Sequence, residues 1–193
     1  MTMIDVAAEL VGDIEAAGMR DVVLVGHSQG GQVLPFMAKL RPSLFSRLIY
    51  VTCSIPIPGQ SVTQMMGMAR HGEKDNEVGW PIDRREMSVE QGFPILFCND
   101  MTPEQTTHFA SNLGQDMWPP LTYSMTDWCY EGIGILPASY VLCLRDNILP
   151  PAWQETFAER FLAERVWRVD AGHQVMNTRP HALAELLRAE AVR

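Results

Sequence analysis

The feature that most constrains this chain is an apolar run that leads directly into the pattern G-x-S-x-G. Val22–Val25 is a block of four apolar, mostly β-branched residues, which is typical of a strand buried on both faces. Gly26, Ser28 and Gly30 follow without an intervening loop. A strand that turns this abruptly into a helix strains the backbone of its central serine and tolerates only small residues two positions before and after it. The pattern therefore predicts an exposed Ser28 hydroxyl at a strand-to-helix elbow.

The residue after this serine, Gln29, is positioned to stabilise negative charge at the elbow. We expect the N–H group of Gln29 at a helix N-terminus, where it lacks a helical partner and the helix dipole favours negative charge. Gln29 is therefore the predicted donor to an oxyanion. G-x-S-x-G is short enough to recur by chance, so the prediction of an elbow depends on the apolar strand that precedes it. The alternative is an ordinary glycine-rich turn that binds a phosphate or simply connects strand and helix.

The two ends of the chain alternate between strands and helices. Further buried strands are predicted at Arg47–Thr52 and Ser139–Leu144, and a last short strand at Val166–Val169. The predicted helices are Ile4–Ala17, opened by a capping box of Thr2 and Asp5, Gly30–Leu40 with a slight kink at Pro35, Pro150–Glu164 and Arg179–Ala189. This alternation predicts an α/β fold with a mostly parallel sheet, flanking helices and right-handed crossovers.

The middle of the chain breaks this rhythm. Residues 55–137 hold most of the tryptophans and many methionines, and prolines interrupt them repeatedly. We predict a helical cap inserted between the two parts of the core, residues 1–54 and 138–193, with helices at Ser61–Arg70, Ser88–Ile95 and Thr102–Leu113. Met-rich and Trp-rich surface above a sheet suggests a cap that lines a substrate pocket. The alternative is that these side chains pack a small core within the cap.

Charge and cysteine usage limit the partners. A formal charge of −8 over 193 residues disfavours nucleic acid and anionic membranes and favours a small-molecule substrate. The four cysteines show no C-x-x-C or Cys/His spacing, so neither a zinc site nor a redox pair is predicted, and Cys53 and Cys143 are expected as buried thiols. With no secretory segment and no apolar run of membrane-helix length, a cytoplasmic protein is expected.

A nucleophilic serine needs a base within hydrogen-bond reach and an acid that orients the base. Asp146 follows the strand Ser139–Leu144, and His173 follows the last predicted strand. Both positions fall at the carboxyl edge of a parallel sheet, where the sites of open α/β sheets lie. Ser28, Asp146 and His173 are therefore the predicted catalytic residues.

Other residues compete for these roles. Asp170 is a rival acid, but it lies only three residues before His173 and more simply ends a strand. Asp100 and Asp127 fall in the cap. His27 lies inside the elbow and is expected to point away from Ser28. The remaining histidines are expected on cap or helix surfaces, namely His71, His108 and His181.

Three segments together resemble the α/β-hydrolase superfamily, and specifically its branch of small methylesterase-like and hydroxynitrile-lyase-like enzymes. They are V-V-L-V-G-H-S-Q-G-G, L-R-D-N-I-L-P-P and D-A-G-H-Q-V-M-N-T-R-P-H-A-L-A-E-L-L. The resemblance implies a Ser28–His173–Asp146 triad, an acyl-enzyme on Ser28, and hydrolysis of a small apolar carboxylic ester without a cofactor. The lyases of this branch have a lysine directly after the catalytic histidine. This chain has Gln174 there, which disfavours cyanohydrin cleavage.

The chain also departs from the family ahead of its first helix. Family members carry further strands there, and a His-Gly loop whose N–H group supplies the second oxyanion donor. Without those strands, Val22–Val25 lacks a neighbour on one side, and such an apolar edge recruits another strand. We therefore expect either a longer polypeptide with an N-terminal segment missing here or a homo-oligomer.

Two other functions remain open at this point. The pocket of a non-catalytic relative would bind a small hydrophobic molecule, although an intact Ser/Asp/His set favours catalysis. A biosynthetic tailoring enzyme would use the same triad for acyl transfer, cyclisation or lactone opening. The residues do not separate this from hydrolysis, because the acyl-enzyme is shared and only the acceptor differs.

Overall fold

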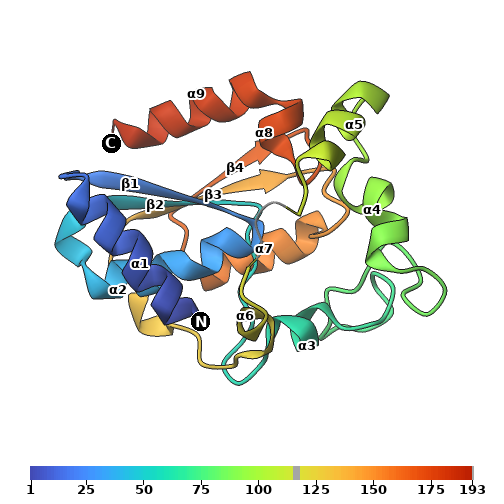
Figure 1. The fold of residues 1–193 in the computed structure, drawn as a ribbon, viewed down its shortest axis with the longest axis horizontal. Helices are drawn as coiled ribbons and strands as arrows, with labels where there is room; N and C mark the ends of the chain where they lie inside the picture. Colours follow the sequence, from blue (N-terminus) through green and yellow to red (C-terminus); the bar gives the residue numbers. More distant parts are fainter. Residues whose placement is uncertain (115–117, 193) are drawn as a thin grey trace.

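A single parallel sheet forms the centre of the protein in this computed structural model, which describes residues 1–114 and 118–192 (Figure 1). Its four strands are β1 (Val22–His27), β2 (Phe45–Val51), β3 (Ala138–Cys143) and β4 (Arg165–Val169). They lie side by side in chain order, and every neighbouring pair is parallel. The predicted α/β architecture is confirmed, and the carboxyl ends of all four strands meet at one edge.

Helices cover both faces of this sheet (Figure 1). One face carries α1 (Met3–Ala16), α2 (Leu34–Leu40) and α7 (Pro151–Arg160), and the opposite face carries α9 (Pro180–Ala191). Along β2, Leu48 and Tyr50 pack toward the first group of helices, while Ile49 and Val51 pack toward α9. This two-sided burial explains why the central strands are apolar throughout.

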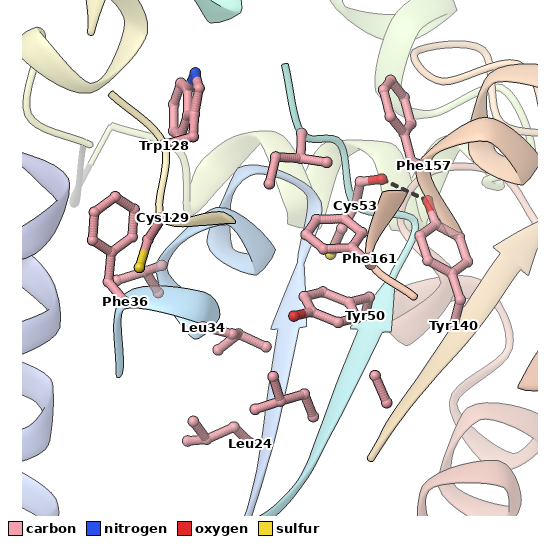
Figure 2. Close-up of a cluster of buried hydrophobic side chains, with 14 of the residues drawn as sticks. Leu24, Leu34, Phe36, Tyr50, Cys53, Trp128, Cys129, Tyr140, Phe157 and Phe161 are labelled. Carbon is pink, nitrogen blue, oxygen red and sulfur yellow. Dashed lines mark hydrogen bonds between the residues drawn. The ribbon is translucent and has the colours of Figure 1, made fainter. Parts of the chain in front are cut away.

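The larger core cluster joins the sheet to the middle of the chain (Figure 2). The ring of Tyr50 stacks on Phe161 with centroids 3.8 Å apart, and the Tyr140 hydroxyl donates to the Cys53 carbonyl at 2.6 Å. Trp128, from the predicted cap, packs into this same cluster and is only 8% exposed. This tryptophan therefore contributes to the main core rather than to a separate core of the cap.

The segment between β2 and β3 is built from short helices. They are α3 (Val62–Met66), α4 (Val89–Phe97), α5 (Pro103–Ser111), α6 (Leu121–Ser124) and a 3₁₀ helix at Tyr130–Gly132. In the part of this segment that the structure describes, β pairing is limited to one bridge between Arg70 and Trp80. The helical character is as predicted, and the division into a core and a separate cap stays a prediction.

Helix starts are the best predicted boundaries. At α1, the backbone N–H and hydroxyl of Thr2 both donate to the Asp5 carboxylate, at 2.7 and 2.8 Å, which is the predicted capping box. At α5, the Thr102 hydroxyl accepts from the Gln105 N–H group, and Pro103 occupies the first helical position. Each start depends on residues within four positions of one another, so the local sequence predicts it.

Three predicted helices differ from the structure. Gly30–Leu40 is not one kinked helix, because a 3₁₀ helix spans Ser28–Val33 and α2 begins at Leu34. Pro35 therefore lies in the first turn of α2, where a missing N–H group costs no hydrogen bond.

The other two differences are early helix ends. The helix predicted at Ser61–Arg70 ends at Met66, because Gly67 adopts a φ of 65°. The helix predicted to reach Glu164 ends at Arg160. The chain reverses at Leu162, whose φ is 52°, and the Glu164 N–H group then donates to the Ala138 carbonyl as β4 begins.

Strand β1 lies at the edge of the sheet and pairs only with β2 among the described strands. Val25 on this strand is 47% exposed, and Val22 and Val23 are half-buried, so β1 is not buried on both faces as its apolar run predicts. The exposure agrees with the expected apolar edge, since β1 has a described neighbour on one side only. All four cysteines are free and buried, as predicted for Cys53 and Cys143. Among the helices that the structure describes, none is long and apolar enough to cross a membrane.

Candidate active site

The elbow after β1 has the predicted backbone strain. Ser28 adopts a φ of 53°, which is uncommon for a residue other than glycine. A Cβ atom on Gly26 would lie 2.6 Å from the Cα atom of Gly31, so a side chain at Gly26 cannot fit beside the turn. The requirement for glycine two positions before the serine is confirmed.

The glycine after the serine is a different one from that predicted. Among the described residues, a Cβ atom on Gly30 would meet only the Trp118 ring, at an ordinary 3.8 Å. On Gly31 it would lie 2.3 Å from the sulfur of Cys53. The crowding therefore comes from the loop after β2, which the elbow sequence itself does not contain.

Three side chains from the carboxyl ends of β1, β3 and β4 form one hydrogen-bonded chain. The His173 Nδ1 atom lies 2.7 Å from Asp146 Oδ2, and its Nε2 atom lies 2.9 Å from Ser28 Oγ. In the neutral ring, Nδ1–H donates to the carboxylate, and Nε2 accepts from the serine hydroxyl. The structure thus brings together Ser28, Asp146 and His173. The rival acid Asp170 instead pairs with Arg145 at 2.7 Å, and its side chain is 72% exposed.

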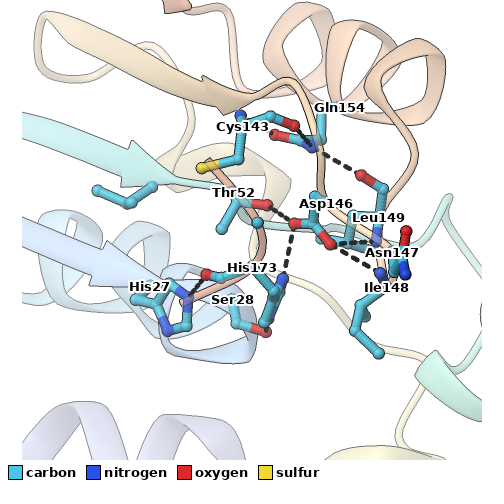
Figure 3. Close-up of polar contacts among 12 residues, drawn as sticks. His27, Ser28, Thr52, Cys143, Asp146, Asn147, Ile148, Leu149, Gln154 and His173 are labelled. Atoms are coloured by element: carbon cyan, nitrogen blue, oxygen red, sulfur yellow. Dashed lines mark hydrogen bonds and ion pairs between the residues drawn. The ribbon is translucent and has the colours of Figure 1, made fainter. Parts of the chain in front are cut away.

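The Asp146 carboxylate is buried and saturated with donors (Figure 3). Its Oδ1 atom accepts from the N–H groups of Ile148 and Leu149, at 2.7 and 2.9 Å. Its Oδ2 atom accepts from the Thr52 hydroxyl as well as from His173. Burial alone would raise the pKa of Asp146, but the charge of His173 and these hydrogen bonds lower it. The carboxylate is therefore ionised at neutral pH.

His27, to which sequence analysis assigned no role, lies beside His173. The two ring centroids are 4.8 Å apart, and the His27 Nε2–H group donates to the backbone carbonyl of His173 at 2.8 Å. Burial, and then the charge of His173, lower the pKa of His27 to about 4. A neutral His27 ring thus anchors the backbone of the loop that carries His173.

The middle segment also contacts both loops of the site. The Asn99 side chain donates to the Arg145 carbonyl at 2.7 Å, and the Asp100 carboxylate accepts from the Gly172 N–H group at 2.7 Å. Arg145 and Gly172 immediately precede Asp146 and His173. Sequence analysis placed Asp100 in the cap but missed this contact, because partners 72 positions apart leave no local pattern.

Of the three histidines expected on surfaces, one lies elsewhere. His71 is half-buried, with Nδ1 2.8 Å from the Val78 carbonyl and Nε2 2.9 Å from the Asn147 carbonyl. It thereby links the middle segment to the loop of Asp146. His108 and His181 are exposed, as predicted.

Apolar side chains and one backbone donor surround the serine. The Phe97 ring lies edge-on to His173 with centroids 5.9 Å apart, and Trp118 lies against Gly30. Gln29 is the second residue of the 3₁₀ helix, where its N–H group has no helical partner, and its side chain donates to the Thr122 hydroxyl at 3.1 Å. Within the described ranges, no three His, Cys, Asp or Glu residues gather where they could hold a metal ion.

Known proteins include relatives of this chain in sequence and neighbours in structure. In sequence, the chain is 27% identical to methylesterase 9 of Arabidopsis thaliana, covering 96% of this chain and 77% of that protein. It is 28% identical to a carbendazim hydrolyzing esterase of Nocardioides sp., covering 94% of this chain and 76% of that one. An extracellular alpha/beta-hydrolase from a Paenibacillus species has a similar structure, with a TM-score of 0.71 at 20% identity, covering 98% of this chain and 79% of that one.

Polyneuridine aldehyde esterase is a second structural neighbour, with a TM-score of 0.64 at 20% identity over 89% of this chain and 72% of that one. The sequence profile of the alpha/beta hydrolase family matches residues 2–186. Because this match extends over nearly the whole chain, including the elbow and the loops of Asp146 and His173, the protein belongs to the alpha/beta hydrolase family.

Proposed function

We propose that this protein is a serine esterase that hydrolyses small, apolar carboxylic esters through an acyl-enzyme on Ser28. The observation that carries the proposal is the hydrogen-bonded chain from the strained Ser28 through His173 to Asp146, with contacts of 2.9 and 2.7 Å. A neutral imidazole whose Nδ1–H group is held by a carboxylate presents the Nε2 lone pair to the serine hydroxyl. That is the protonation state a general base needs.

The proposed reaction proceeds in two halves. Ser28 Oγ attacks the ester carbonyl carbon while His173 Nε2 takes the hydroxyl proton, and the N–H group of Gln29 donates to the oxyanion that forms. His173 then returns the proton to the departing alkoxide, which leaves as an alcohol. In the second half, His173 activates a water molecule, and the acid is released from Ser28.

Two further observations support an apolar ester as substrate. Phe97 beside His173 and Trp118 beside Gly30 offer apolar contacts close to the serine. The similar proteins named above include a methylesterase and two other esterases, so ester cleavage fits the family branch.

Ser28→Ala tests this proposal. The variant removes only the hydroxyl, whose partner is His173 Nε2, so we expect an unchanged fold and a loss of ester hydrolysis of at least about 1,000-fold. A panel of methyl and aryl esters would measure activity, and a fluorescent organophosphate would measure labelling of the nucleophile. Labelling that survives in the Ser28→Ala protein contradicts the assignment of Ser28.

A further inference from the structure

Strand β2, like β1, β3 and β4, has its carboxyl end at the candidate active site. β2 lies between β1 and β3, and Thr52 is the first residue beyond its carboxyl end. Its side chain is fully buried, and its N–H group donates to the Val141 carbonyl at 2.9 Å, which extends the pairing with β3. Thr52 therefore occupies the one strand end that contributes no residue to the chain of Ser28, His173 and Asp146.

The backbone of Thr52 is strained. Its φ is 42°, in the left-handed region that β-branched residues strongly disfavour. Strain of this kind persists where surrounding contacts hold the residue, and it clusters at functional sites. At Thr52 the holding contact is the hydroxyl, which donates to Asp146 Oδ2.

The oxygen that Thr52 contacts is the one that faces the base. Asp146 Oδ2 accepts from both the Thr52 hydroxyl and His173 Nδ1–H, whereas Oδ1 accepts two backbone N–H groups. A hydroxyl that donates to Oδ2 fixes the rotation of the carboxylate and withdraws charge from the oxygen that would stabilise a protonated His173. Thr52 thus has both a geometric and an electrostatic route to the base.

We propose that Thr52 is a positioning residue of this site, which aims Asp146 Oδ2 at His173 and limits how strongly that oxygen stabilises the protonated base. This inference rests on the proposed function, because it assigns the base to His173. Among the described residues, the other titratable groups that face this pair are His27, which donates to the His173 carbonyl, Asp100, which accepts from Gly172, and the Cys143 and Tyr140 side chains, whose pKa values are raised by burial and also by the charge of Asp146. None of these four groups is the partner of the Thr52 hydroxyl, which donates to Asp146, so a change at Thr52 leaves them in place.

Thr52→Val is the main test, because valine keeps the shape and the β-branched strain but lacks the hydroxyl. We expect kcat to fall about tenfold with little change in KM. We also expect the acid limb of the kcat/KM profile to move upward by about half a pH unit or more, since Oδ2 would carry more charge toward the base. Thr52→Ser restores the hydroxyl and should return both quantities to near wild type.

The matched control is Ser54→Ala, which removes another buried hydroxyl from the same loop. The Ser54 hydroxyl contacts the Gln32 side chain at 3.1 Å and no residue of the proposed triad, so its loss should leave the acid limb unchanged. A folded Thr52→Val protein with wild-type kcat and pH profile overturns the inference about Thr52. So does a Thr52→Ser protein as impaired as Thr52→Val.

The same experiment separates this inference from the proposed function. If Ser28→Ala abolishes activity while Thr52→Val does not lower it, only the role of Thr52 is wrong. If Ser28→Ala remains active, the proposed function itself is wrong. If Thr52→Val folds poorly, Thr52→Ala provides the same loss of the hydroxyl in a smaller side chain. Circular dichroism before each assay shows which variants are folded, and only those are compared.

Discussion

Two buried carboxylates, at opposite edges of the same sheet, have very different surroundings. Asp146 lies at the carboxyl edge and is 4% exposed, and Glu190 in the last turn of α9 lies at the amino edge and is 2% exposed. Both accept several hydrogen bonds. The partners differ in charge, since two arginines surround Glu190, whereas an imidazole, a hydroxyl and backbone N–H groups surround Asp146.

Glu190 is surrounded by permanent donors. It accepts from the Trp167 ring nitrogen at 2.9 Å and from the Ser139 hydroxyl, and it pairs with Arg47 at 3.2 Å and Arg165 at 3.7 Å. Burial alone would raise the pKa of Glu190, but the two hydrogen bonds and the two arginine charges lower it. These contacts tie α9 to three strands.

Asp146 has no arginine or lysine among its hydrogen-bond partners in the described structure. Its one ionisable partner is His173, whose other nitrogen faces Ser28. A carboxylate held by permanent cations serves packing, whereas one held by backbone N–H groups, a hydroxyl and an imidazole is suited to orient a proton carrier. The contrast predicts that changes at the two edges affect different properties of the protein.

The largest effect is expected at Asp146. Asp146→Asn keeps the size of the side chain but no longer holds the Nδ1–H form of His173, so kcat should fall by about 1,000-fold or more. The free energy of unfolding should change far less than at Glu190. Asp170→Asn is the control, because Asp170 pairs with Arg145 at the surface. A greater loss of activity in Asp170→Asn would reassign the acid.

The next largest effect is on stability, at the other edge. Glu190→Ala leaves Arg47 and Trp167 without their buried acceptor, and we expect it to lower the free energy of unfolding by about 3 kcal/mol. Urea denaturation measures the loss, and kcat of the folded fraction should stay within about twofold of wild type. An inactive but stable Glu190→Ala protein would show that Glu190 affects activity and not stability, contrary to this prediction. Glu155→Ala, which removes an exposed ion pair with Arg168, should cost less than about 1 kcal/mol.

The third predicted effect appears only on acidification, and it is a difference in pH response between the two edges. The folded pKa of His27 is about 4 against 6.5 for the unfolded chain, so only the unfolded chain binds this proton as the pH falls between these values. Stability should therefore drop by about 3 kcal/mol over that range. Glu190, whose folded pKa is lowered from 4.5, loses its contribution only at still more acidic pH.

His27→Gln separates these two ranges. The glutamine amide can replace the Nε2–H donor to the His173 carbonyl, but it does not titrate. Unfolding of this variant should therefore depend less on pH between 6.5 and 4 than unfolding of wild type. Equal slopes for the two proteins would show that His27 does not cause the acid sensitivity.

Much of this protein follows from local sequence. The alternation of apolar strands with helices, the capping box at Thr2 and the strained elbow at Ser28 depend on neighbouring residues, so sequence patterns are enough to predict them. The positions of Asp146 and His173 also follow, because parallel strands bring their carboxyl ends to one edge whatever lies between them. That rule places residues at an edge but does not say which side chains meet.

The contacts that hold the site arise only in the tertiary structure. Gly31 is required because Cys53 comes from another strand end, and Asn99 and Asp100 reach the loops of Asp146 and His173 from the middle segment. In the sequence Thr52 is an ordinary end of a buried strand, whereas in the fold its hydroxyl contacts Asp146. Such pairs lie far apart along the chain, and hydrogen bonds and close packing depend on distances of a few ångströms that a sequence pattern does not encode.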